Sequence, residues 1–162
     1  MRLALRSLLG VLGVTAVLIA LSILVLGAEA TGTFGEQMFD AVTGRAGAGS
    51  PAWPPTMDNE LRFYAALWLA FGVLTLRAAA KLEARINDVP WLAGVFFLGG
   101  IGRLISWMAV GAPHPFFLSL MAAELGLPLI LIFLWLRVRT NIAQTRQIMA
   151  NANRQTARES AL

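Results

Sequence analysis

Two hydrophobic runs are joined by a five-residue turn in residues 91–136, WLAGVFFLGGIGRLISWMAVGAPHPFFLSLMAAELGLPLILIFLWL. The runs cover residues 91–110 and 116–136, and each contains a single ionisable side chain, Arg103 or Glu124. A helix that crosses a bilayer needs about 20 predominantly apolar residues, so each run is long enough to span one. Because the turn is short, the sequence predicts two antiparallel membrane helices that lie side by side.

The two charges are predicted to meet within the membrane. Arg103 lies seven residues before Val110, and Glu124 lies eight residues after Phe116. With a rise of about 1.5 Å per residue, both should sit roughly 10–12 Å from the same membrane surface. An unpaired charge on a spanning helix costs about 2.5–3.5 kcal/mol, which pairing would partly relieve. We also expect Arg62, at the end of another apolar run, to join them as a third member.

Three glycines near Arg103 favour close contact between these helices. Gly99, Gly100 and Gly102 leave room for a neighbouring backbone, as small residues do in membrane helix pairs. Pro128 cannot donate a hydrogen bond to the Glu124 carbonyl, which leaves a spare acceptor beside the carboxylate. The cluster is interpreted as a latch that fixes helix register. The alternatives are a proton- or ion-coupled site and a pocket for a lipid headgroup or another anion.

The whole composition is that of a membrane protein. Of the 162 residues, 57% are apolar and 14% are charged, and the mean hydropathy is +0.68. Soluble domains have about 25% charged residues. Two further runs, about 7–26 and 61–76, complete an all-α bundle of four transmembrane helices over residues 1–137. A basic cytoplasmic tail, 138–162, is predicted to continue the last helix.

Basic residues predict the orientation. The first run could be a signal peptide cleaved near Ala28-Glu29-Ala30, but its length favours a retained anchor. With a cytoplasmic N-terminus, ten basic residues lie inside and only Arg45 and Arg62 lie outside. The positive-inside rule then places both termini in the cytoplasm. The ten residues are Arg2, Arg6, Arg77, Lys81, Arg85, Arg137, Arg139, Arg146, Arg154 and Arg158.

Two segments outside the spans are candidate contact surfaces. In the outer loop, 27–57, Thr33 is expected to cap a short helix through Thr43, with Phe34, Met38 and Val42 on one face. This face is predicted to rest on the membrane interface, or to dock an extracytoplasmic partner. In the tail, Arg137, Arg139 and Arg146 are expected to contact anionic lipid or a cytoplasmic partner.

The residue content argues against several functions. The chain has no cysteine and one histidine, His114, so no metal site, cofactor or catalytic residue is predicted. His114 lies between two prolines and is interpreted as a turn residue, with pH sensing as the alternative. The basic residues flank membrane spans, so we expect lipid contact and no nucleic-acid binding. The chain is predicted not to be an enzyme.

Three segments of the chain resemble a protein family. They are Asp58-Asn59-Glu60-Leu61-Arg62-Phe63-Tyr64, Leu98-Gly99-Gly100-Ile101-Gly102-Arg103-Leu104-Ile105-Ser106 and Glu124-Leu125-Gly126-Leu127-Pro128. Over residues 55–137 the chain resembles small bacterial four-helix membrane proteins that are catalogued as a domain of unknown function. The resemblance implies four helices in a bacterial inner membrane and no settled activity. The chain is also similar to an accessory subunit of an actinobacterial MCE-type lipid-uptake transporter.

Two functions remain from this reasoning. The preferred hypothesis is a non-catalytic accessory or regulatory subunit, with membrane lipids and other integral membrane subunits of a lipid transporter as partners. The alternative is a small oligomeric transporter or channel for a solute or anion that uses Arg103 and Glu124.

Overall fold

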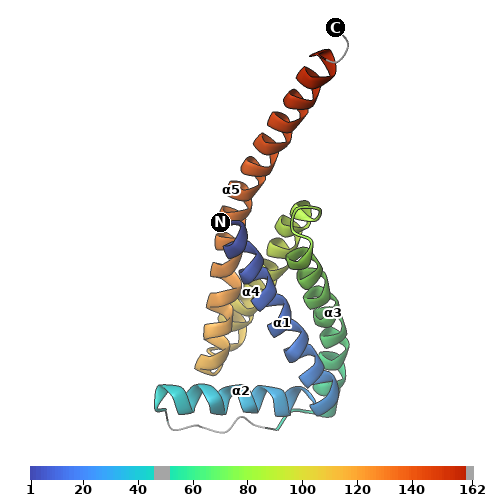
Figure 1. The fold of residues 1–162 in the computed structure, drawn as a ribbon. Coiled ribbons are helices and arrows are strands. Elements are labelled where there is room, and N and C mark those ends of the chain that lie inside the picture. Colours follow the sequence, from blue (N-terminus) through green and yellow to red (C-terminus); the bar gives the residue numbers. More distant parts are fainter. Residues whose placement is uncertain (46–51, 160–162) are drawn as a thin grey trace.

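The structure is a computed structural model that describes residues 1–45 and 52–159, and within α5 the side chains of residues 142, 143, 145, 146 and 148–159 are not described. The described residues form five α-helices and one short 3-10 helix (Figure 1). These elements are α1 (Arg2–Leu26), α2 (Ala28–Thr43), α3 (Pro55–Ala80), η1 (Ile86–Asp88), α4 (Val89–Val110) and α5 (Pro115–Glu159).

Four of the helices are long and apolar enough to cross a membrane, as the sequence predicted. The candidate spans are Arg2–Leu26, Pro55–Ala80, Ile86–Val110 and Pro115–Asn141. Several helices are longer than the apolar runs that predicted them, because the helical backbone continues into the charged residues on either side. The predicted helical continuation of the last span is confirmed as far as Glu159, since α5 runs without interruption for 45 residues, and residues 160–162 lie outside the described residues.

Helices α1 and α3 form one closely packed pair. A β-carbon added to Gly72 would lie 2.9 Å from the backbone nitrogen of Val17, and one added to Gly13 would lie 2.8 Å from Cγ of Leu76. Real β-carbons almost never come so close to other atoms. The two glycines therefore let the helix backbones touch, in the way that small residues do in membrane helix pairs.

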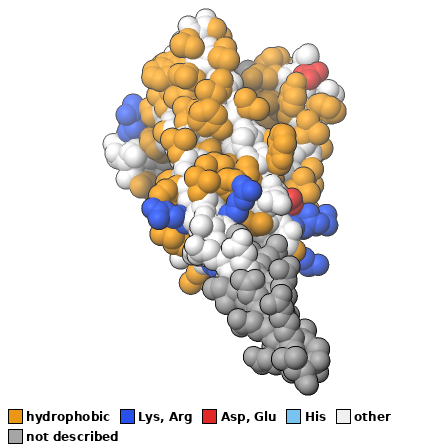
Figure 2. Space-filling model, turned by 90° about the horizontal axis from the view of Figure 1, so that it is seen from above, with side chains coloured by type: hydrophobic (Ala, Val, Ile, Leu, Met, Phe, Trp, Pro, Cys, Tyr) orange, Lys and Arg blue, Asp and Glu red, His pale blue; other side chains and the backbone are white. Residues whose placement is uncertain are grey.

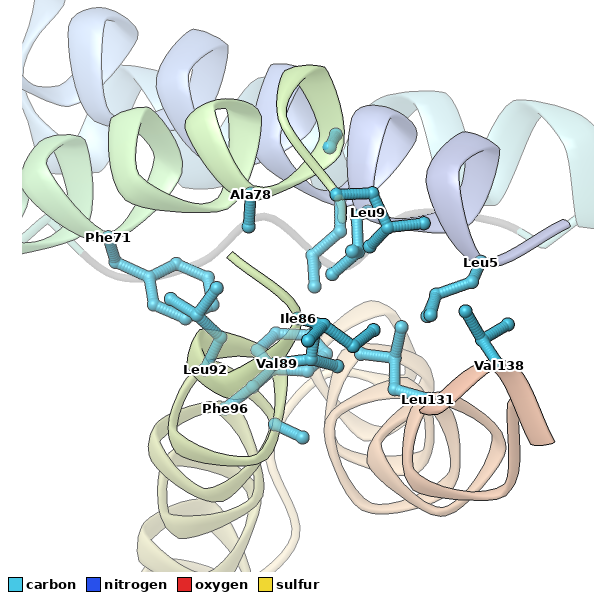
Figure 3. Close-up of a cluster of buried hydrophobic side chains, with 14 of the residues drawn as sticks. Leu5, Leu9, Phe71, Ala78, Ile86, Val89, Leu92, Phe96, Leu131 and Val138 are labelled. Carbon is cyan, nitrogen blue, oxygen red and sulfur yellow. The ribbon is translucent and has the colours of Figure 1, made fainter. Parts of the chain in front are cut away.

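The hydrophobic core lies where all four long helices come together. Leu5 and Leu9 of α1, Val89 of α4, and Leu131 and Val138 of α5 are fully buried there (Figure 3). In the same region Nε1 of Trp135 donates a 2.8 Å hydrogen bond to the carbonyl of Ile86, which joins α5 to η1. Such burial contributes about 1.5–3 kcal/mol per large aliphatic side chain relative to exposure in water, and less relative to lipid.

We call the end of the molecule where the N-terminus lies beside residues 80–84 the basic end. Arg2, Arg6, Lys81 and Glu83 surround an open pocket there, and Arg2 pairs with Glu83 at 2.8 Å. Figure 2 views the molecule from this end and shows Lys and Arg side chains among a predominantly hydrophobic surface. The N-terminus and the point where α5 leaves the bundle lie on the same side, since Leu5 and Val138 belong to one core.

Helix α2 lies across the opposite end, which we call the α2 end (Figure 1). It begins at Ala28, so the prediction of a short helix capped by Thr33 is wrong at its start. Gly27 adopts a φ of 97°, a conformation that favours glycine, and this lets the chain turn sharply from α1 into α2. Asp58 accepts a 3.2 Å hydrogen bond from the Ala28 backbone nitrogen and so satisfies a donor in the first turn of α2.

Candidate functional site

Arg103 of α4 and Glu124 of α5 contact each other directly. Nε of Arg103 donates a 2.7 Å hydrogen bond to Oε2 of Glu124, so the predicted pairing is confirmed. Gly100, one turn before Arg103, allows the approach, because an added β-carbon would lie 2.9 Å from Leu125 and 3.0 Å from Cβ of Glu124. Of the three glycines predicted to matter, Gly102 faces open space.

The two partners differ in burial. The Glu124 side chain is 10% exposed, whereas that of Arg103 is 39% exposed. The Arg103 guanidinium also lies 5.9 Å from the ring centre of Phe117, within range of a cation–π contact. Within the described part of the chain, the bond through Nε is the one hydrogen bond that Arg103 makes, and Oε1 of Glu124 accepts none. The terminal amino groups of Arg103 and Oε1 of Glu124 therefore remain available for hydrogen bonds to another molecule.

Arg62 does not join this pair, contrary to the prediction. Its Nε donates to Oδ2 of Asp58 at 2.7 Å, and its Nη1 donates to the Leu24 carbonyl at 2.6 Å. Asp58 lies four residues earlier on the same helix, which puts it within easy reach. The Leu24 carbonyl lies in the last turn of α1 and lacks a helical partner. Arg62 thus fixes the corner between α1 and α2.

A cavity of about 210 Å³ adjoins the Arg103–Glu124 pair. All four long helices contribute to its wall, and both charged side chains line it. Most other lining residues are apolar, among them Leu8, Leu12, Ile19, Trp68, Phe96 and Leu127. Trp68 also stacks on Phe71 with ring centres 4.9 Å apart, which fixes this part of the wall. The arrangement can hold an apolar group next to a pair of hydrogen-bonding charges.

At the α2 end, His114 meets an acidic partner that the sequence reasoning missed. Its Nε2 lies 3.3 Å from Oδ1 of Asp40 without the alignment of a hydrogen bond, and both side chains are largely buried. Nδ1 of His114 accepts a 3.3 Å hydrogen bond from the backbone nitrogen of Phe116, so a neutral ring carries its proton on Nε2, facing Asp40. The sequence signal for this contact was the presence of two acidic residues, Glu36 and Asp40, four residues apart in the predicted helix. The structure shows that both are buried.

The residues that were predicted to contact lipid or a partner are exposed where the structure describes their side chains. Phe34, Met38 and Val42 are 64%, 53% and 82% exposed and share one side of α2. Near the basic end, the guanidinium of Arg137 lies 5.4 Å from the Phe133 ring, and that of Arg139 lies 5.1 Å from the Trp135 ring. The side chain of Arg146 lies outside the described residues, as does the 46–51 segment of the outer loop.

Metal-binding groups do not gather in the described ranges. No three His, Cys, Asp or Glu side chains lie close enough there to hold an ion. The Arg103–Glu124 pair and its cavity are therefore the site that we consider further, as a place for binding.

Comparison with known proteins assigns the chain to a family without assigning it an activity. The profile of DUF4345, a domain of unknown function, matches residues 4–136. This range includes the first span and α2, which lay outside the resemblance recognised from the sequence. No curated protein and no solved structure is significantly similar to the chain. Because the match covers most of the chain, the protein belongs to the DUF4345 family of domains of unknown function.

Proposed function

We propose that the protein is a non-catalytic accessory or regulatory subunit of a larger assembly in the bacterial inner membrane. The observation that carries the proposal is the extension of α5. The apolar run of α5 ends at Leu136, whereas the helix continues to Glu159. These 23 further residues correspond to about 35 Å of helix.

An isolated helix of this kind gains little stability from its own sequence. Helices shorter than about 12–15 residues are marginal in water, and longer ones in proteins depend mainly on packing. Figure 1 shows that α5 leaves the bundle along its own axis, without bending across the end of the molecule. In a membrane this direction leads away from the bilayer surface, which favours a protein partner over anionic lipid.

The proposed orientation places both termini in the cytoplasm. Support comes from the ten-to-two distribution of basic residues and from the position of Leu5 and Val138 in one core. The extension carries Arg146, Arg154 and Arg158, so an acidic surface is the complementary partner. On the resemblance noted above, we propose a lipid transporter of the MCE type as the assembly.

Purification from native membranes tests this proposal. In mild detergent, the full-length chain should copurify with a stoichiometric membrane partner that mass spectrometry identifies. Reversing two charges of the extension, Arg154→Glu with Arg158→Glu, should reduce recovery of the partner at least tenfold. Arg45→Glu, which changes an exposed arginine at the α2 end, is the matched control and should retain the partner. A chain that runs alone would contradict the subunit proposal.

The cavity favours a second candidate, a small oligomeric transporter or channel, because both charges of the pair line it. Purified protein in liposomes should then move a solute or anion, and Glu124→Gln should abolish this movement. Flux that is unaffected by the substitution would remove this candidate.

A further inference from the structure

We infer that the cavity beside Arg103 and Glu124 binds one long-chain fatty acid, with its carboxyl group on the ion pair and its acyl chain among the apolar lining residues. This inference concerns a ligand of the chain itself and does not depend on the subunit proposal. Three features carry it: the unused hydrogen-bonding groups, the size of the cavity and its opening at the surface.

The ion pair offers both halves of a carboxylic acid's hydrogen-bonding pattern. Arg103 uses only Nε within the described residues, so its terminal amino groups remain available as donors, and Oε1 of Glu124 remains available as an acceptor. In apolar surroundings such groups are costly to leave without partners. A protonated carboxyl group accepts from the guanidinium and donates to the carboxylate.

Charge balance favours this ligand over a phospholipid headgroup. Arg103 and Glu124 already neutralise each other, so an anionic phosphate would bring an unbalanced negative charge into the membrane interior. A fatty acid that binds as the neutral acid adds no net charge. The planar carboxyl group also matches the planar guanidinium fork.

The cavity has room for a slender chain. Its volume of about 210 Å³ lies below the range of about 300–1,000 Å³ that is common for drug-sized ligands. It extends along α1 from Ile19 to Leu8, eleven residues apart, or about 16 Å of helix. Such a shape suits part of one acyl chain and excludes a lipid with two chains inside.

The cavity is also reachable from the bilayer. Val11 lines it and is 65% exposed, so the cavity reaches the surface of the bundle beside α1. If α1 spans a membrane, that surface faces lipid. A fatty acid can therefore enter sideways without crossing water.

Photolabelling of the full chain in neutral phosphatidylcholine nanodiscs tests this inference. The probe is palmitic acid that carries a diazirine in its chain, and mass spectrometry maps the labelled residues. Labelling should concentrate on the cavity wall of α1 and at Trp68, and excess palmitic acid should suppress it. Phosphatidylglycerol should not compete. Equal competition by phosphatidylglycerol would overturn the fatty-acid assignment.

Matched variants separate the cavity from the general lipid surface. Ala123→Phe fills the cavity, whereas Ala122→Phe adds the same ring at an exposed neighbouring position that does not line it. Specific labelling should fall at least tenfold in the first variant only. Thr15→Phe, with Val14→Phe as its control, repeats the comparison from α1 if Ala123→Phe does not fold.

The ion pair is tested by changing both charges together. The double variant Arg103→Gln with Glu124→Gln removes the charges without leaving one alone, and it should weaken labelling about tenfold, as expected for lost charge-assisted hydrogen bonds. Labelling that survives both the double variant and Ala123→Phe would overturn the inference.

Discussion

At the level of individual residues, Arg103 and Glu124 depend on their ion pair to different degrees. Glu124 is 10% exposed and depends on Arg103 for charge compensation, whereas Arg103 is 39% exposed and can turn its guanidinium toward other acceptors. Removing the partner of a buried charge costs about 3–5 kcal/mol, while replacing both charges is often nearly neutral. The contact joins α4 to α5, and Glu124 should depend on it more than Arg103 does.

We predict that Arg103→Gln lowers the melting temperature more than Glu124→Gln does. The double variant should melt above the Arg103→Gln protein, because two glutamine amides can still hydrogen-bond to each other and no charge remains alone. Thermal unfolding of the four proteins in the same detergent measures this coupling. Arg137→Gln, far from the pair, should leave the melting temperature unchanged. A double variant less stable than either single one would contradict the argument.

Asp58 and Arg62 are a second pair whose role is local. Asp58 holds the start of α2 through the Ala28 nitrogen, and Arg62 holds the end of α1 through the Leu24 carbonyl. We predict that Asp58→Ala speeds hydrogen exchange at the start of α2, while Glu60→Ala, at an exposed position, does not. Hydrogen–deuterium exchange with mass spectrometry measures this. Equal protection in the two variants would show that Gly27 geometry alone fixes the corner.

At the level of the helices, the sequence predicted where the long spans lie better than it predicted which helices pack against each other. Apolar length alone identifies α1, α3, α4 and the first part of α5, because the membrane demands it. The Arg103–Glu124 contact was also predictable, since a short turn makes the two depths comparable. The packing of Gly13 on Gly72 was missed, because it joins helices separated by α2 and its linker. The early start of α2 was missed because Asp58, which supports Ala28, is 30 residues away.

We predict that Gly72→Ala destabilises the α1–α3 pair. The added β-carbon would lie 2.8 Å from Cγ2 of Val17 and 2.9 Å from a backbone atom, which cannot move independently. Overpacking of this kind costs about 1–3 kcal/mol. Gly102→Ala is the control, because Gly102 also lies within a helix and a β-carbon added there would meet open space. Thermal unfolding in detergent compares the two, and equal melting temperatures would argue against close packing at Gly72.

At the scale of the whole molecule, the main prediction concerns orientation in the membrane. Four candidate spans return the chain to its starting side, and Leu5 and Val138 meet in one core. Which side that is follows only from the distribution of basic residues. Function was less predictable still, because the exposed apolar side chains of α2 and the arginines of the last helix do not specify one kind of partner.

The absence of cysteine makes the orientation testable. We predict that Ala41→Cys, an exposed position on α2, reacts with a membrane-impermeant maleimide in intact spheroplasts. Gln144→Cys, an exposed position beyond the last span, should react only after lysis. The cysteine-free parent is the control for unspecific labelling. The reverse pattern would invert the proposed topology.

The continuity of α5 has a mechanical consequence. Val138 is held in the core, with about 35 Å of helix between it and Pro115 at the α2 end and about 32 Å between it and Glu159 at the tip. The arm toward Pro115 is held by Glu124 and Leu131, whereas the arm toward Glu159 extends from this anchored part as the same continuous helix. A change in the tilt of α5 within the bundle would therefore displace the far tip sideways.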